Sequence, residues 1–364
     1  TALGHEAGQL MSSGHSNTAI GAQTLRNGNV SVCTAVGYRA LQDNTSNANT
    51  AVGADALKEN QGGGNNTAVG HDCMDQNISG DNNTAVGASA LDANTTASNN
   101  SAFGTSALSA NTTGQYNVAV GTNSLSQNTT ASNNTACGND ALKVNTNGAN
   151  NTAMGINALD GNTSGSHNTA LGAFTLNNHT TGVNNTAVGM EAGANLTTGS
   201  NNTLIGHDAG TANSPSGNQT TGSNVVCLGN DSVQFLCAAV STISTSDARD
   251  KTDVQDFTQG LSWINSLRPV TYKWDRRSWY GTEEEPYGTP DGTKKQSRTH
   301  VGFLAQEVLE IEKANGYGDN NDNSLLVTLN ADGMGYGIGY ERLVPILVNA
   351  IKELSTKVTA LEAG

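Results

Sequence analysis

Side chains able to bind a metal or form disulfides are few in this 364-residue sequence, and they are widely spaced. The cysteines are Cys33, Cys73, Cys137, Cys227 and Cys237. Their number is odd and no two form a Cys-x-x-Cys pair, so the sequence supports neither a disulfide framework nor a zinc site. We expect small apolar core residues here, and the sequence predicts no cofactor and no metal centre.

Acidic residues next to histidines or to one another do not converge either. The pairs His5-Glu6, His71-Asp72 and His207-Asp208 occupy equivalent places in a repeat but lie many repeats apart, so we interpret each as a solvated polar pair. Other carboxylates are scattered, as at Asp55, Glu59, Asp72 and Asp75, and sugar-stacking aromatic residues are nearly absent from this part. Because glycoside cleavage requires paired carboxylates, a polysaccharide-degrading enzyme is the weaker alternative.

The composition differs from that of an average globular protein. Only 35% of the residues are hydrophobic, 4% are aromatic and 13% are charged, with 43 glycines. The net charge of -14 argues against binding to nucleic acid or to an anionic membrane. No apolar run approaches the length of a membrane-spanning helix, so we expect no membrane insertion. The scarcity of charge also argues against simple disorder and favours a repeat.

A repeat with the pattern Asn-Thr-Ala-apolar-Gly accounts for this bias. Its glycines are Gly4, Gly21, Gly37, Gly53, Gly70, Gly87, Gly104, Gly121, Gly138, Gly155, Gly172, Gly189 and Gly206, with a degenerate copy at Gly229. The spacing is 17, 16 and 16 residues and then 17 up to Gly206, followed by an insertion of six residues. Such a unit fits one coil of a β-solenoid, with two short strands joined by turns.

Two polar features of each unit have structural explanations. The asparagine four residues before the glycine, as in Asn83 or Asn100, is expected to form a ladder of stacked amides. The glycine itself is expected to adopt a positive φ in a turn. Because each coil has few apolar residues, we expect the array to share its core with other chains. The pattern resembles head repeats of trimeric autotransporter adhesins and Asn-Thr-Ala-Val-Gly arrays of phage tail fibres.

A second domain follows the array, which we place at residues 1–229, after a linker at residues 230–245. All three tryptophans lie in residues 246–364. We expect an α+β domain with a helix over residues 253–267, a strand over residues 270–274, a hairpin or loop over residues 283–297 and a strand leading into a helix over residues 302–308.

A heptad pattern predicts a C-terminal coiled coil over about residues 340–363. Its seam residues are Val344, Leu347, Ile351, Leu354, Val358 and Leu361. Branched residues alternating with leucine favour dimers by the general rule, but three heptads are too few to determine the oligomeric state, and a fibre favours a trimer. The alternative is an amphipathic helix that packs on its own domain.

Four segments of the second domain resemble the endosialidase-type C-terminal intramolecular chaperone, a self-cleaving peptidase domain of phage tail spikes and fibres. The segments are SDARDKTDV at 246–254, LRPVTYKW at 267–274, HVGFLAQEV at 300–308 and AIKEL at 350–354. Asp250 departs from the family, which usually has an apolar residue there; this puts the cleavage rate in doubt more than the fold. The resemblance implies that three chains fold on this domain, which then cleaves the Thr245–Ser246 bond.

The resemblance also implies the roles of individual residues. Ser246 would be the nucleophile and Lys251 the general base of a Ser-Lys dyad, which requires that the lysine amine become neutral through desolvation or a nearby cation such as Arg249. Five residues apart, the two side chains lie on different faces of a helix or strand, so we expect a bend between them or help from another subunit. Asp247 is a helix cap or a partner of Arg249, and His300 is a structural residue or an oxyanion donor.

Together these features predict a homotrimeric phage tail-fibre or spike fragment, part of the virion, that attaches to a host-surface receptor such as a polysaccharide. The chaperone domain would be released after assembly in the host cytoplasm. The array begins in the middle of a motif at Thr1, so we expect the fibre to extend upstream. The main alternative is a cell-surface trimeric adhesin with the same maturation domain.

Overall fold

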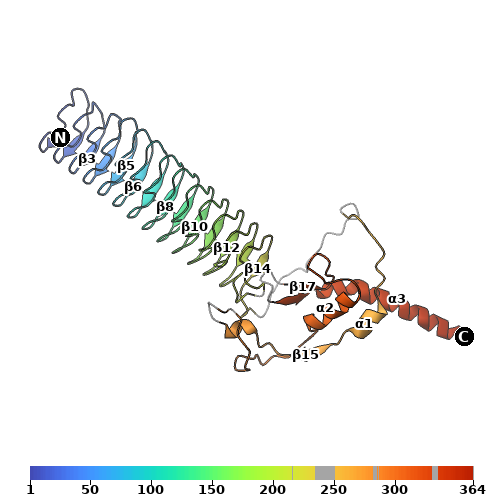
Figure 1. Cartoon of the computed structure of the whole chain (residues 1–364). Helices are drawn as coiled ribbons and strands as arrows, with labels where there is room; N and C mark the ends of the chain where they lie inside the picture. The colour runs from blue at the N-terminus through green and yellow to red at the C-terminus, as the bar shows by residue number, and fades with distance from the viewer. Residues whose placement is uncertain (215, 234–250, 282–284, 286, 330–334, 364) are drawn as a thin grey trace. The chain divides into compact units, whose positions relative to one another are not determined.

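A computed structural model describes residues 1–214, 216–233, 251–281, 285, 287–329 and 335–363. The chain divides into two compact units, Thr1–Ser232 and Val233–Gly364, and each is described by itself. The first contains the repeat array, and the second contains the α+β elements (Figure 1).

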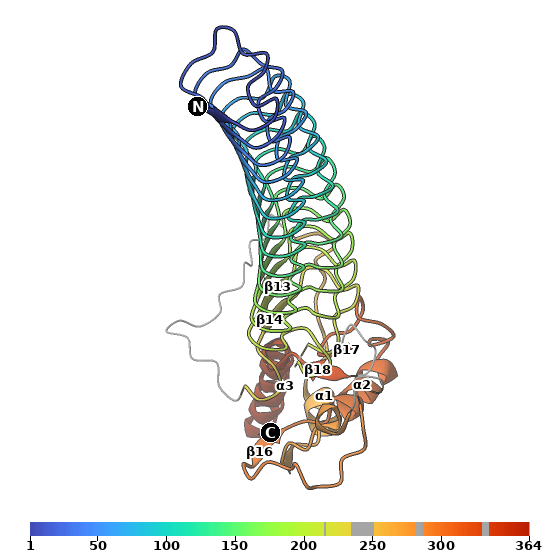
Figure 2. The ribbon, with the colours of Figure 1, turned by 90° about the vertical axis from the view of Figure 1, so that its left-hand side faces the viewer.

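The repeat array is a parallel β-solenoid, as the sequence predicts. Each coil adds one short strand to a 14-stranded parallel sheet whose order follows the chain. The strands are β1 (Ala2–Leu3), β2 (Thr18–Ile20), β3 (Thr34–Val36), β4 (Thr50–Val52), β5 (Thr67–Val69), β6 (Thr84–Val86), β7 (Ser101–Phe103), β8 (Val118–Val120), β9 (Thr135–Cys137), β10 (Thr152–Met154), β11 (Thr169–Leu171), β12 (Thr186–Val188), β13 (Thr203–Ile205) and β14 (Val226–Leu228). Figure 2 shows the coils stacked on one another.

The second strand expected in each coil is absent from the described coils. The Ala-Leu pair after the glycine lies instead in a turn in which alternate residues have positive φ, such as Ser89 (51°) and Leu91 (52°). The turns still bond to one another between coils, because the Leu91 N–H donates to the Ala107 carbonyl over 3.0 Å. A left-handed residue at every second position prevents the extended conformation of a strand.

The core of the solenoid is complete within one chain, contrary to our expectation of a core shared between chains. The strand alanine and the turn alanine and leucine are fully buried in most coils, as are Ala85, Ala90 and Leu91. Buried asparagines fill the rest of the interior. Each coil therefore has a packed core although it contains few large apolar residues.

Two rows of asparagine run through the interior. The first is the predicted row, in which Asn83 Oδ1 accepts from the Asn100 N–H (2.9 Å) and Asn83 Nδ2 donates to the Ala97 carbonyl (2.8 Å). The second row lies seven residues after the motif glycine, where Asn94 Nδ2 donates to Asn77 Oδ1 of the preceding coil over 2.7 Å. Because these partners repeat from coil to coil along most of the array, the buried amides there are compensated for the loss of water.

The motif glycines are required by close packing of the coils. Gly87 has φ of +143°, and a Cβ atom there would lie 2.4 Å from the carbonyl oxygen of Gly104 in the next coil. The predicted positive φ is confirmed. The insertion before Gly229 leaves the ladder intact, since Thr203 of β13 still pairs with Val226 of β14.

The second unit contains two small antiparallel sheets and three α-helices among its described residues. Its elements are α1 (Leu261–Ser266), β15 (Val270–Tyr272), the 3-10 helix η2 (Arg277–Tyr280), β16 (His300–Gly302), α2 (Ala305–Ala314), β17 (Val327–Leu329), β18 (Tyr336–Ile338), the 3-10 helix η3 (Tyr340–Arg342) and α3 (Leu343–Glu362). β15 pairs with β16, and β17 pairs with β18. Trp263, Val308, Leu326, Val327 and Ile346 form the core.

The first predicted helix of this unit begins later than expected. Residues 253–260 are not helical, and α1 starts at Leu261. The apolar Phe257 still reaches the core, where its ring lies edge-on against Trp263 with centroids 6.3 Å apart. Asn349 of α3 donates to the carbonyls of Phe257 (2.7 Å) and Gln259 (3.2 Å), which compensates the backbone for missing helical bonds.

Candidate functional site

Most residues of the predicted cleavage site lie outside the described part of the chain. Thr245, Ser246, Asp247 and Arg249 all belong to residues 234–250. Lys251 is described and is exposed in a segment without helix or strand. The dyad and the bend that it requires therefore stay predictions.

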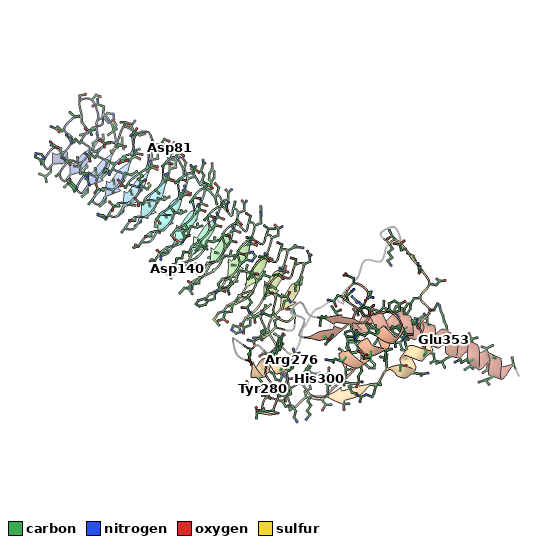
Figure 3. All side chains as sticks on the ribbon, in the orientation of Figure 1. Asp81, Asp140, Arg276, Tyr280, His300 and Glu353 are labelled. Atoms are coloured by element: carbon green, nitrogen blue, oxygen red, sulfur yellow. The ribbon has the colours of Figure 1, made fainter. Side chains whose placement is uncertain are left out.

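His300 lies in an aromatic cluster next to β15. Its ring stacks on Tyr272 of the facing strand, with centroids 5.6 Å apart, and meets Trp274 edge-on at 6.3 Å. The Arg276 guanidinium lies 4.3 Å from the centre of the Trp274 ring. Arg276, Tyr280 and His300 appear in the same part of the second unit in Figure 3. His300 therefore makes structural ring contacts, and its role as an oxyanion donor stays a prediction. Burial raises the pKa of the Tyr272 hydroxyl.

The second and third of the four motif segments hold each other in place. β15 belongs to residues 267–274 and β16 to residues 300–308, so their backbone ladder joins the two segments. Arg268 adds an ion pair with Glu307, in which the guanidinium Nε lies 3.1 Å from Glu307 Oε2. Hydrogen bonding to Arg268 lowers the pKa of the Glu307 carboxyl. The motif pattern alone does not indicate this pair, although the opposite charges of the two motif segments were a usable signal.

The fourth motif segment lies on α3 and contacts the residues that follow the first motif segment in the sequence. Glu353 Oε1 accepts from the backbone N–H of Leu261 over 3.1 Å, at the start of α1. Asn349, one residue before the segment, holds the two carbonyls of residues 257 and 259. Figure 3 shows Glu353 on this helix. The C-terminal helix therefore fixes the chain only a few residues after Lys251.

Tyr340, in η3, connects the third segment to the start of α3. Its hydroxyl accepts from the Phe303 N–H over 3.1 Å, and the two rings stack with centroids 6.0 Å apart. A Cβ atom at Gly302 would lie 2.4 Å from this hydroxyl. The glycine in the third motif is therefore explained by a tyrosine nearly forty residues away, which the sequence pattern did not reveal.

Comparison with known families agrees with the first three motif segments and does not reach the fourth, at residues 350–354. Residues 246–317 match the family model described as "Chaperone of endosialidase". The match begins at Ser246 and includes β15, β16 and α2. No curated protein and no solved structure matches the chain. The family match and the 17-residue solenoid together bear out the resemblance stated from the sequence.

The predicted seam of α3 is exposed in the single chain. The exposed fractions are 57% for Val344, 43% for Leu347, 64% for Ile351, 46% for Leu354, 49% for Val358 and 81% for Leu361. A different face of the same helix packs on its own domain, through Leu343, Ile346 and Ala350. The helix thus has two apolar faces, of which only one is covered by the domain.

A buried carboxylate that the sequence analysis missed stabilises the C-terminal part of this unit. Glu312 of α2 is fully buried and accepts from the N–H groups of Leu326 and Val327 and from the Ser324 hydroxyl.

Within the described residues, no three His, Cys, Asp or Glu side chains are placed to hold a metal ion. Across the same part of the chain, no helix is both long and apolar enough to cross a membrane.

Proposed function

We propose that the C-terminal domain is an intramolecular chaperone that templates the assembly of three chains and then cleaves the Thr245–Ser246 bond. The observation that carries this proposal is the match to the chaperone of endosialidase, which begins at Ser246. Cleavage in front of this residue would separate the folded array from the domain on which it assembled.

The chemistry proposed for this bond needs no group beyond water and the chain itself. The Ser246 Oγ attacks the Thr245 carbonyl while neutral Lys251 accepts its proton, and the peptide bond becomes an ester as the Ser246 amine leaves and takes up a proton. Water then hydrolyses the ester. The products are a carboxylate at Thr245 and a free hydroxyl at Ser246.

Trimer formation is supported by the exposed seam of α3. Six apolar residues along one helix face are costly to leave in water, at up to about 1.5–3 kcal/mol for full burial of each. A parallel coiled coil covers them, and α3 contacts the segment that follows Lys251 through Asn349 and Glu353. We propose that this contact makes cleavage depend on assembly.

We further propose that the released array belongs to a phage tail fibre or spike in the virion and binds a host-surface receptor such as a polysaccharide. Two of the carboxylates considered for sugar cleavage are engaged in ion pairs. Asp55 Oδ1 lies 2.7 Å from Arg39 Nε, and Asp75 Oδ1 lies 3.2 Å from Lys58 Nζ. This favours attachment over degradation of the receptor.

The dyad is tested by Ser246→Ala and Lys251→Ala, with Ser244→Ala and Lys295→Ala as matched controls. We expect both dyad variants to remain full length on a denaturing gel and to elute as trimers, because assembly precedes cleavage. The wild type and the controls should yield two fragments, and mass spectrometry should identify one that begins at Ser246. Cleavage at this bond in both dyad variants would refute the assignment.

A further inference from the structure

A continuous row of apolar side chains runs along the outside of the 14-stranded sheet. It consists of the third residue of each three-residue strand, together with Leu3, and we call it the outer stripe. Its members are Leu3, Ile20, Val36, Val52, Val69, Val86, Phe103, Val120, Cys137, Met154, Leu171, Val188, Ile205 and Leu228. The parallel register places each member directly beside the next, as in Val86 beside Phe103. The stripe therefore spans the whole array.

Eight of the fourteen members of the stripe are exposed in the single chain, and the other six are half-buried. Phe103 is 41% exposed, Met154 48% and Ile205 43%, whereas the middle residue of the same strands is buried. The row that follows each motif glycine adds exposed apolar residues at Tyr38, Ile156 and Met190. Exposed large apolar residues elsewhere on the solenoid are scattered, at Leu10, Val32, Ile78, Tyr116, Val118, Phe174 and Val226.

No lysine, arginine, aspartate or glutamate lies in the sheet or in the position directly after the motif glycine. The charged side chains of the array lie outside its strands, as Asp81 and Asp140 do in Figure 3. Acidic residues predominate in a chain whose net charge is -14. Two copies can therefore approach through the stripe without bringing like charges directly together.

The stripe is as large as the largest apolar patch that a monomeric protein usually exposes. At about 4.8 Å per coil, fourteen strands extend over about 60 Å. One row of side chains about 5 Å wide gives a patch of order 300 Å², within the range of such patches. Patches of this size are often functional.

The periodicity of the stripe identifies its partner. Apolar side chains recur at the rise of one coil, so a partner must present side chains at the same spacing along the whole length. A second copy of this chain does so when the two arrays run parallel and in register. Resting on the proposed trimer, we propose that the three solenoids pack parallel through their outer stripes, around one common axis.

Cys137 provides a probe inside the proposed interface. It lies in the stripe and is half-buried, whereas Cys33, Cys73 and Cys227 are buried in the single chain. In a parallel, in-register trimer the three Cys137 side chains lie opposite one another. Mild oxidation of the native full-length chain carrying Cys237→Ser should then join two of the three chains through Cys137, and a non-reducing gel should show a covalent dimer together with monomer.

A second position tests direction and register. In a Cys137→Ser and Cys237→Ser background, Val52→Cys places a thiol in the stripe five coils away, and Thr96→Cys places one on an exposed position outside the strands. We expect Val52→Cys to cross-link with itself. An antiparallel pair would separate the two thiols by several coils, and a pair shifted by two or more coils would separate them by about 10 Å or more. Thr96→Cys should remain monomeric on the gel.

The outcomes separate this inference from the proposed function. Suppose that light scattering shows a trimer, and that Thr96→Cys cross-links while Cys137 and Val52→Cys do not. This result would overturn the outer stripe as the interface and leave the chaperone proposal standing. A trimer with no cross-link at any position would overturn it too. A chain that cleaves but stays monomeric would contradict both the trimer and this packing.

Discussion

His179 occupies a position at which the preceding coils place a buried asparagine. It is fully buried, and its Nε2 lies 3.0 Å from the Gly182 carbonyl, the same kind of contact that the asparagines make. An amide nitrogen can donate to two acceptors, but the ring nitrogen that contacts Gly182 has no second proton for Asn162 Oδ1, which is buried without a hydrogen-bond partner. The row ends here, because the next coil has Leu196 at this position. Burial also lowers the pKa of His179.

We predict that His179→Asn reduces the sensitivity of the array to acid and changes its stability at neutral pH little. The amide would donate to Asn162 Oδ1, but the next coil has Leu196 at this position, so the new Oδ1 would lack a donor. The gain and the cost, about 1–3 kcal/mol each, offset one another. Because the folded state keeps the histidine pKa low, its neutral form is compatible with the fold above the unfolded value of about 6.5, and stability is lost as pH falls below that value. Denaturant unfolding at neutral and mildly acidic pH measures both effects.

The control for this substitution is His167→Asn, which removes an exposed histidine of the neighbouring coil. It should change neither the free energy of unfolding nor its dependence on pH by a comparable amount. Equal acid sensitivity in the wild type and in His179→Asn would show that this ring is not the sensitive group.

At the scale of the elements, the glycine row makes the closest contacts between coils. Gly104 has φ of +135°, and a Cβ atom there would lie 2.5 Å from the Gly121 carbonyl oxygen. We predict that Gly104→Ala destabilises the array by more than the backbone strain of about 1–3 kcal/mol, because the steric clash with the next coil adds to it. Thermal unfolding measures the loss.

Gly62→Ala is the matched change at a glycine without these constraints. A Cβ atom there would meet its nearest neighbours at 3.6 Å or more, and its φ is not positive. This variant should unfold at nearly the wild-type temperature. Similar losses in both variants would contradict the role given to the coil contact.

Prediction from sequence succeeded for these elements where the signal repeats. The solenoid, its glycine turns and the first asparagine row follow from a pattern present in every coil. The second strand was wrong because nothing in the pair Ala90-Leu91 reveals the left-handed conformation of Leu91. The early start of the first helix was wrong because Asn349, far along the chain, bonds the backbone of residues 257 and 259.

The candidate site was predictable only to the extent that short motifs carry it. Motif order indicated the chaperone domain, and the family match supports it. Sequence spacing did not reveal that Arg268 pairs with Glu307, because this contact depends on how β15 and β16 align. The Ser246–Lys251 geometry also depends on tertiary structure and stays a prediction.

At the scale of the whole molecule, assembly is expected to depend on the uncovered seam of α3. We predict that Ile351→Asp prevents trimer formation and leaves most of the chain uncleaved, because a charge placed at a seam position would have to be buried among apolar side chains. Light scattering and a denaturing gel on the same sample measure the two effects.

The control is Thr356→Asp, an exposed position on the same helix away from the seam. It has a similar cost in helix propensity and should leave both the trimer and the cleavage intact. A cleaved, trimeric Ile351→Asp protein would show that the coiled coil is not the element that couples assembly to processing.

The self-contained coil has a consequence for how the length of the array can vary. Each coil buries its own alanine, leucine and asparagine side chains and bonds to the coils directly before and after it. Gaining or losing one 17-residue unit in the gene would therefore change the length by about 4.8 Å and preserve the contacts of every other unit. Unequal recombination could therefore change the length of the array in equal steps and leave the C-terminal domain unchanged.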